Sequence, residues 1–453
     1  MKMIKLVLGS LLSLLLIILL ALWAFPPELL RIGANYSAKV VCSNVFLANR
    51  DPEDVLRTDV QAPGAYILRY MKVSVDRDSG VVRAGFFGFI GSGLAVARPG
   101  AGCTAVPDGN LSLAKAAVPM AAAAAGPAAP AESAPVSPPA PVLWPDGEAT
   151  AGHMQIERAI SDNALVGPGM RAIVVVDHGR ITAERYGAGI TSQTPLLGWS
   201  MSKTVIAGLI GMLVKDGKLT LDQAGFWPAG DGREHIRIAD LLAMSSGLRF
   251  NEAYGAVSDI TRMLYLRPDM AAFAHDQPLA HPVGEFWGYS SGTALVLSRI
   301  LQQAAGSADF ASQRLFKPLG MRSAVLEADE HGTPVGSSYM YATAHDWARY
   351  GQFLLQDGVW KDSRLLPEGY VAMMATPVKA SKGEYGQGLT WLWKAEAAKP
   401  FGIPPDAFYL SGHDGQRMVV IRSRQLVILR LGLTPAAGGY SPEPLIKAVL
   451  AAT

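Results

Sequence analysis

The chain has 453 residues and half of them are hydrophobic, so it is long enough for two or three units with a large buried core. Its 40 Lys and Arg residues nearly balance 38 Asp and Glu residues, leaving a net charge of +2. This balance gives no reason to expect nucleic acid as a partner, because proteins that bind it usually carry a marked basic surface.

The first predicted element is an apolar helix over residues 6–25, a stretch of 20 residues without a charge. That length is enough to span a bilayer. Lys2 and Lys5 precede it and favour an N-terminus in the cytoplasm, with the rest of the chain on the outer, periplasmic side of the cytoplasmic membrane. We therefore expect residues 1–26 to form a single-pass membrane anchor. A cleaved signal peptide and a buried soluble helix are the alternatives.

Residues 27–113 predict a small N-terminal domain whose function the sequence does not indicate. Two strands, over residues 72–76 and 81–87, are expected around an Asp- and Gly-bearing turn. Both cysteines of the chain, Cys42 and Cys103, lie here. In an oxidising compartment they are expected to form a disulfide, and two unrelated buried thiols are the alternative. Neither has the spacing of a metal or redox site, which favours a cap or spacer domain.

Residues 114–149 predict a linker. Between Ala114 and Leu143, 13 of 30 residues are Ala and 7 are Pro. Repeated prolines prevent a continuous helix and favour an extended, semi-rigid chain. The pattern also allows part of this segment to pack on the surface of a neighbouring domain.

Residues 150–453 are long enough for one large catalytic domain. The sequence predicts a short helix over 154–161, strands over 172–176 and 180–186, and a mostly helical middle. Strands over 408–411, 418–422 and 426–431 follow, with a last helix over 442–450. Strands at both ends predict an α+β domain, in which the terminal strands meet in one antiparallel sheet flanked by helices and a helical subdomain.

Ser200 and Lys203 form the first chemical signal, a Ser-x-x-Lys pattern in front of an uncharged run of helix-forming residues. A lysine one turn after a serine lies on the same helix face, within reach of the hydroxyl. Burial favours the neutral amine, which can then act as a base. The pattern alone occurs often by chance, so it needs support from other parts of the chain.

Two further triplets supply that support. Tyr289-Ser290-Ser291 precedes an apolar helix, and a phenol there can relay a proton while Ser291 can bond substrate or the lysine. His413-Asp414-Gly415 follows a predicted strand, where a glycine allows close approach to the backbone. Taken singly, each triplet is more often core packing or a turn.

In this order the three triplets resemble the serine β-lactamase and penicillin-binding-protein family, and the resemblance covers most of residues 155–453. That family has Ser-x-x-Lys, then Tyr-x-Asn/Ser, then a Lys/His-x-Gly triplet on an edge strand. The phrases at residues 196–199, 240–248 and 318–321 are typical of its class C-like branch. This branch includes esterases, D-amino-acid peptidases and nylon-oligomer hydrolases.

The resemblance implies a β-lactamase-like fold in which Ser200 is the nucleophile, Lys203 its base and Tyr289 a second acid/base. It implies an oxyanion hole formed by the backbone N–H groups of Ser200 and Gln416. The substrate-binding residues that it implies are Ser291, His413, Asp414 and Gly415. It implies no cofactor and no metal, and the expected partner is a small-molecule or peptide-like substrate.

Two departures from the family pattern narrow the expected reaction. His413 replaces the usual lysine, which removes a fixed charge for a substrate carboxylate, and Ser291 replaces the longer Asn. No glutamate is assignable to the deacylation role known in the class A branch. We therefore expect ester or amide hydrolysis through an acyl-enzyme. A β-lactamase or D-Ala-type peptidase and a non-catalytic penicillin-binding-like sensor are the alternatives.

An α/β-hydrolase is a further alternative, because Gly198 to Ser202 nearly matches the G-x-S-x-G elbow. The last glycine of that motif is replaced by Ser202, however, and the alternating strand–helix pattern of the fold is absent. The sequence therefore favours the β-lactamase-like interpretation.

Overall fold

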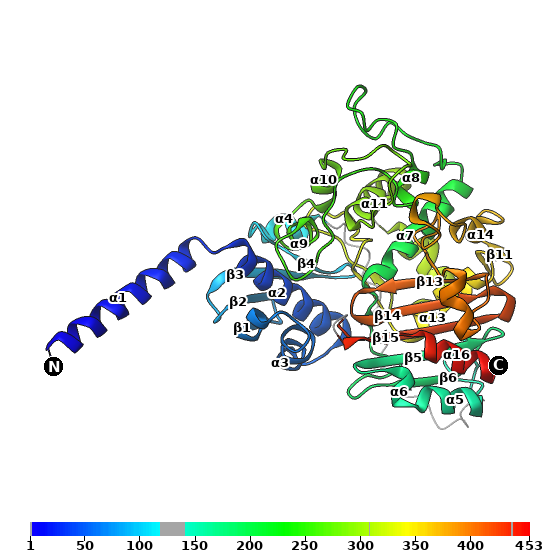
Figure 1. The fold of residues 1–453 in the computed structure, drawn as a ribbon, viewed down its shortest axis with the longest axis horizontal. Helices are drawn as coiled ribbons and strands as arrows, with labels where there is room; N and C mark the ends of the chain where they lie inside the picture. Colours follow the sequence, from blue (N-terminus) through cyan, green and yellow to red (C-terminus); the bar gives the residue numbers. More distant parts are fainter. Residues whose placement is uncertain (1, 118–140, 308, 436–437) are drawn as a thin grey trace.

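The computed structural model describes residues 2–117, 141–307, 309–435 and 438–453 (Figure 1). Helix α1 (Lys2–Ala24) extends away from the rest of the molecule. Within the described residues it is the one helix long and apolar enough to cross a membrane, and none of its most apolar window is buried. A signal sequence meets the same criteria of length and composition. An N-terminal unit (residues 27–117) and a C-terminal domain (residues 141–453) make up the body.

The N-terminal unit is a four-stranded antiparallel sheet in the order β1-β2-β3-β4, covered by helix α2 (Glu28–Ala48). Both predicted strands are confirmed, whereas α2, β3 and β4 were not predicted. Gly93 lets α2 lie directly on the sheet, since a Cβ there would be 2.1 Å from the backbone of Ala34. A disulfide joins Cys42 on α2 to Cys103 on β4. The elements are β1 (Met71–Asp76), β2 (Val81–Phe86), β3 (Ile90–Arg98), β4 (Gly102–Ala105), α3 (Pro52–Val55), π-helix η1 (Leu56–Gln61), 3-10 helix η2 (Tyr66–Tyr70) and α4 (Leu111–Ala116).

The predicted linker is described only at its two ends, and its residues 118–140 lie outside the described part of the chain. The expectation of an extended chain is wrong for residues 114–116, which belong to α4. This helix forms because Asn110 caps it, accepting a hydrogen bond from the Leu113 N–H, and because it contains no proline, the next one being Pro119. At the other end, Trp144 is completely buried and donates to the carbonyl of His345 in the C-terminal domain.

The C-terminal domain is built on a six-stranded antiparallel sheet in the order β12-β13-β14-β15-β5-β6. Strand β15 pairs with β5, which confirms that strands from both ends of the domain meet in one sheet. The strands are β5 (Met170–Asp177), β6 (Arg180–Tyr186), β12 (Trp391–Leu392), β13 (Ala407–Gly412), β14 (Gln416–Ile421) and β15 (Leu426–Gly432). A second sheet in the order β7-β9-β8 comprises β7 (Leu196–Leu197), β8 (Val325–Leu326) and β9 (Met340–Ala342), and β10 (Val359–Trp360) pairs with β11 (Ser363–Arg364).

Helices cover both faces of the large sheet (Figure 1). Side chains alternate along a strand, so Val174 of β5 packs in the same core as α7 and α13, while Val175 packs with α5 and α16. The helices are α5 (Met154–Ser161), α6 (Asn163–Val166), α7 (Ser202–Lys215), α8 (Ile238–Leu242), α9 (Asp259–Leu266), α10 (Met270–His275), α11 (Ser291–Ala305), α12 (Lys317–Leu319), α13 (Ala344–Leu355), α14 (Tyr370–Met374), α15 (Ala395–Ala398) and α16 (Glu443–Ala452). The predicted helices over 154–161 and 442–450 correspond to α5 and α16.

The N-terminal unit packs directly on the C-terminal domain. Lys39 of α2 forms an ion pair of 2.5 Å with Glu327, and both side chains are buried. The Ser43 hydroxyl and the backbone N–H of Cys103 also donate to Glu327, at 2.9 and 2.6 Å. Buried charges are stable only when paired and hydrogen-bonded, so this junction is specific to the two surfaces it joins.

Candidate active site

The nucleophile predicted from the sequence lies in a 3-10 turn, η3 (Trp199–Met201), that leads directly into α7. Ser200 is half-buried. Trp199 has a φ of 48°, a left-handed conformation that non-glycine residues adopt only when the surrounding structure holds them there. A Cβ at Gly198 would lie 2.2 Å from Trp347, so α13 fixes the chain just before the nucleophile.

Lys203 lies one turn after Ser200 and is buried. Its Nζ is 2.9 Å from the Ser200 Oγ, 3.0 Å from the Ser291 Oγ and 2.9 Å from the carbonyl oxygen of Ser337. It also lies 4.8 Å from the centre of the Tyr289 ring. Burial lowers the pKa of Lys203 to about 8, against an opposing effect of the Glu252 carboxylate. The amine can therefore lose its proton at a pH close to neutral.

Tyr289 lies over this amine at the end of the loop that enters α11. Burial raises the pKa of its phenol above the ordinary value of 10, with a further increase from Glu252 and a decrease through Ser200. The phenol therefore keeps its proton across the physiological range. It can donate a hydrogen bond or a proton to a reacting group, but it cannot serve as the first base.

Glu252 is a site residue that sequence reasoning missed. Its two carboxylate oxygens accept hydrogen bonds from the hydroxyl and backbone N–H of Ser291, at 2.6 and 2.8 Å. Lys203, Ser291 and Glu252 thus form one hydrogen-bonded chain. Burial raises the pKa of Glu252, and Lys203 together with the bonds from Ser291 opposes that rise. The one available signal was its position four residues after the family phrase at residues 240–248.

The third triplet forms the tight connection between β13 and β14. His413 is exposed to 38% and stacks on Tyr254 with ring centres 4.7 Å apart, and its Nε2 lies 3.3 Å from the Asp414 carboxylate. We expected Gly415 to admit a substrate. In the structure a Cβ at Gly415 would lie 2.8 Å from the guanidinium of Arg430, so a larger residue here would have to displace that side chain. Gly415 also has a φ of 83°, a left-handed conformation that favours glycine over other residues.

The two groups expected to form the oxyanion hole come from neighbouring elements. Gly412, at the end of β13, approaches the turn before Ser200 so closely that a Cβ would lie 2.2 Å from the Gly198 carbonyl oxygen. Gln416 begins β14, and its buried side chain exchanges hydrogen bonds with Gly432. The pairing of Ser200 and Gln416 N–H groups as an oxyanion hole stays a prediction.

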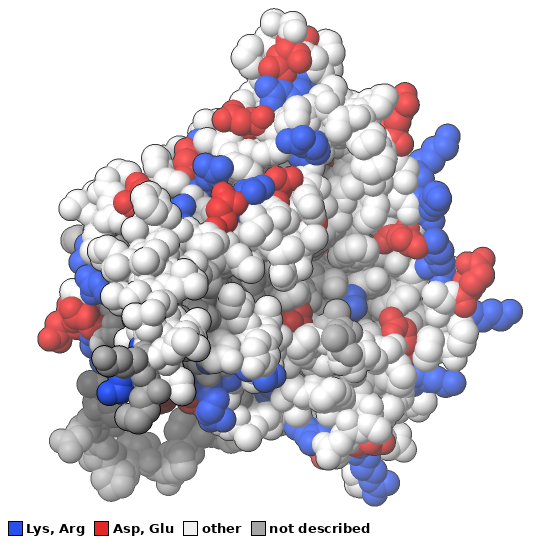
Figure 2. Space-filling model, turned by 60° about the vertical axis from the view of Figure 1, so that its left-hand side comes forward, with Lys and Arg blue, Asp and Glu red and all other residues white. Residues whose placement is uncertain are grey.

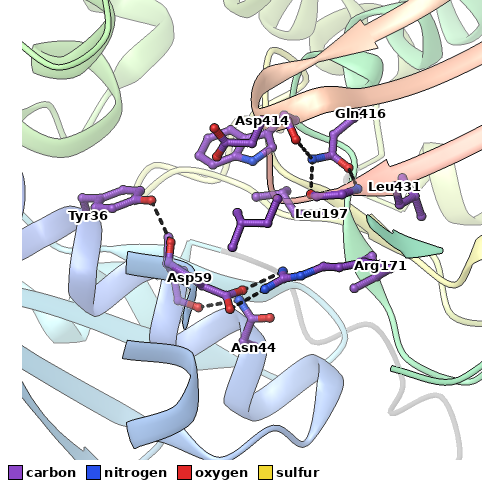
Figure 3. Close-up of a pocket in the computed structure, with 13 residues that line it drawn as sticks. Tyr36, Asn44, Asp59, Arg171, Leu197, Asp414, Gln416 and Leu431 are labelled. Atoms are coloured by element: carbon purple, nitrogen blue, oxygen red, sulfur yellow. Dashed lines mark hydrogen bonds and ion pairs between the residues drawn. The ribbon is translucent and has the colours of Figure 1, made fainter. Parts of the chain in front are cut away.

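The N-terminal unit reaches the back of this triplet (Figure 3). Asp59 accepts two hydrogen bonds from Arg171 of β5, at 2.8 and 2.5 Å, and against the effect of burial Arg171 and Arg50 together lower the pKa of Asp59 to about 2. A cavity of about 30 Å³ lies here, bounded by Tyr36 on one side and by Asp414 and Gln416 on the other. The N-terminal unit therefore lies across this small cavity from the triplet.

In the part of the chain that the structure describes, no group of three or more His, Cys, Asp or Glu side chains is arranged to hold a metal ion. On the face shown in Figure 2, acidic and basic side chains are interspersed.

Comparisons with known proteins bear on the family and the fold. A sequence model of the family described as Beta-lactamase matches residues 163–434. No curated protein sequence matches the chain. A provisionally named 6-aminohexanoate-dimer hydrolase from Bacillus anthracis is similar at a TM-score of 0.54 and 19% identity, covering 62% of this chain and 79% of that one.

Two other solved structures resemble this chain over nearly the whole of their own length. A family VIII carboxylesterase has a TM-score of 0.52 and 16% identity, over 68% of this chain and 99% of its own. A penicillin-binding protein from Bacillus halodurans has a TM-score of 0.52 and 16% identity, over 66% and 99%. At these identities the likeness shows the fold alone.

Proposed function

This chain belongs to the beta-lactamase family, and we propose that it is a serine hydrolase that cleaves an ester or amide bond through an acyl-enzyme on Ser200. The observation that carries the proposal is the buried Lys203 amine, 2.9 Å from the Ser200 hydroxyl, with its pKa lowered to about 8. A serine hydroxyl is a weak nucleophile until an adjacent base removes its proton.

Lys203, rather than Tyr289, is the first base in this proposal. At pH 7 about one tenth of an amine with a pKa near 8 is neutral, whereas a phenol with a raised pKa is almost wholly protonated. Lys203 therefore takes the proton of Ser200 as the hydroxyl attacks the carbonyl. Tyr289 then donates a proton to the leaving group, and the lysine restores it through the same hydrogen-bonded cluster.

In deacylation water is the nucleophile: the neutral Lys203 amine takes a proton from it, and a proton returns to the Ser200 oxygen as the bond to the acyl group breaks. The backbone N–H groups of Ser200 and Gln416 stabilise the oxyanion in both halves of the reaction, and one such donor is commonly worth about 3 kcal/mol. Glu252 holds Ser291 against Lys203 and stabilises the charged lysine between steps. In this scheme Glu252 is a positioning residue.

The substrate class follows from the third triplet. His413 stands where penicillin-degrading relatives carry a lysine, so the site lacks that fixed cation for a substrate carboxylate. An uncharged ester or amide therefore suits the site better than a β-lactam. The stacking of His413 on Tyr254 gives it the position of a substrate-contacting side chain.

We further propose that α1 anchors the chain in the cytoplasmic membrane with the hydrolase on the periplasmic side. Lys2 and Lys5 precede the span, and the disulfide between Cys42 and Cys103 suits an oxidising compartment. The proposal for the compartment is independent of the proposal for the reaction.

The experiment that tests the reaction is a hydrolysis panel with the full chain in detergent micelles. The panel contains short-chain 4-nitrophenyl esters, linear amides, D-amino-acid amides and β-lactams, with Ser200→Ala as the control. We expect ester turnover and fluorophosphonate labelling, both lost in Ser200→Ala. Labelling without turnover of any substrate would instead support an acylated sensor, and turnover that survives Ser200→Ala would refute the proposed nucleophile.

A further inference from the structure

The N-terminal unit supplies one wall of a cavity beside the proposed nucleophile. The cavity has a volume of about 290 Å³. Leu29 and Ile32 of α2 line it together with Ile67 and Ala65 of the following loop, and the opposite wall belongs to the C-terminal domain. The family match begins only at residue 163, so this wall is additional to the domain that the family defines.

The cavity is lined by a chain neighbour of the proposed nucleophile. Trp199, which immediately precedes Ser200, forms part of its lining, and so does His413 of the third triplet. The ring centres of these two residues are 5.4 Å apart. A substrate whose carbonyl lies on Ser200 therefore has this cavity within reach of one of its substituents.

The chemistry of the wall selects an apolar substituent. The residues that the N-terminal unit contributes carry no charge, and they are mainly aliphatic. A charged substituent placed against them would lose its hydration without gaining a partner. An alkyl or acyl chain in the cavity would instead be removed from water, and the binding free energy would become more favourable with each buried methylene.

We propose that this cavity is a binding subsite, built jointly by the two parts of the molecule, for a medium-length hydrocarbon chain of the substrate. The inference rests on the proposed ester or amide hydrolysis at Ser200. It assigns the N-terminal unit a role in substrate selection. It also makes the preferred substrates amphiphilic, with a reactive carbonyl at the head of the chain.

The test compares 4-nitrophenyl octanoate with 4-nitrophenyl acetate, using the full chain in micelles. Full burial of a methylene is worth about fourfold in binding, so we expect the wild-type ratio of kcat/KM, octanoate over acetate, to exceed about 10. Ala65→Trp fills the cavity from the N-terminal wall and should lower that ratio at least about tenfold. The matched control is Ala62→Trp, an exposed alanine outside the lining, which should keep the wild-type ratio.

An unchanged ratio in Ala65→Trp, or a wild-type preference for acetate, would overturn the subsite. A second measurement separates this result from failure of the proposed reaction. Octanamide should bind to Ser200→Ala protein in micelles, measured by calorimetry, and should bind at least about tenfold more weakly to the same protein carrying Ala65→Trp. Equal binding to both proteins would refute the subsite even if no ester is ever turned over.

Discussion

Replacing Glu252 with Gln should move the pH dependence of the reaction to lower pH. Glu252 opposes the fall in the pKa of Lys203 that burial causes, because its negative charge stabilises the ammonium form. Glutamine keeps the shape of the side chain and removes the charge. Lys203 should then release its proton more easily, so a larger fraction of the enzyme is active at pH 7.

The size of the effect follows from the hydrogen-bonded chain. Bonds of 3.0 and 2.6 Å join Lys203 to Ser291 and Ser291 to Glu252, which places the two charges within about 6 Å of each other. At an effective dielectric constant of about 20, charges at that distance interact by about 2–3 kcal/mol. Since about 1.4 kcal/mol corresponds to one pKa unit, the rising limb of kcat/KM should move down from about pH 8 by roughly one to two pH units.

The assay is kcat/KM for 4-nitrophenyl acetate between pH 5 and 10, which reports the free enzyme. Glu368→Gln, an exposed carboxylate, is the control and should leave the limb in place. If the rising limb of the kcat/KM profile of Glu252→Gln stays near pH 8 or moves to higher pH, the electrostatic reasoning is refuted. A normal acylation burst followed by no turnover would refute it as well, because Glu252 would then transfer a proton in deacylation.

Further predictions test the other parts of the argument. Lys203→Arg should lose about 1,000-fold or more in kcat, measured by ester turnover, because a guanidinium cannot deprotonate; near-native turnover would make Lys203 a structural cation only. Glu148 and Glu184 raise the pKa of His345 to about 9, so their contribution to stability is complete below about pH 6.5 and is lost as the pH rises through 9. The free energy of unfolding should therefore fall less over this range in His345→Gln than in the wild type, and equal slopes would contradict this. A topology reporter fused after residue 453 should be active only outside the cytoplasm. Glu327→Gln should lower the free energy of unfolding by about 3–5 kcal/mol in chemical denaturation.

The sequence was sufficient for five strands of the main sheet of the C-terminal domain and for its first and last helices, because these have clear local patterns, whereas β12 and the β7-β9-β8 sheet were not predicted. The β-branched run that became β5 and the uncharged run that became α7 were both visible without a structure. The order of the three triplets then indicated the family, which the family comparison bears out. The proximity of Lys203 to Ser200 also follows from spacing alone, because one helical turn separates them.

Contacts between residues far apart in the chain were not predictable in this way. Glu252 meets Ser291 across 39 residues, and its place four residues after the phrase at 240–248 does not by itself indicate that contact. The contact of Gly415 with Arg430 from another strand was likewise not predictable, and its role toward a substrate stays a prediction. The N-terminal unit looked like a separate spacer because its Lys39 and Asp59 find their partners only in the folded molecule.

The prediction for Glu327 depends on how completely the junction satisfies its carboxylate. Lys39, the Ser43 hydroxyl and the Cys103 N–H all donate to it in a site without solvent. Glutamine would leave the buried ammonium of Lys39 without its counter-charge. It would also place an amide N–H₂ against the Ser43 or Cys103 donor. Both changes lower the free energy of unfolding. Glu330→Gln is the matched control. Burial raises the pKa of Glu330 to about 8, so at pH 7 its side chain is mostly the neutral acid. Replacing it with an uncharged amide of the same shape should therefore change the free energy of unfolding by less than about 1 kcal/mol. Equal losses in the two variants would mean that the Lys39 pair does not hold the two parts of the molecule together.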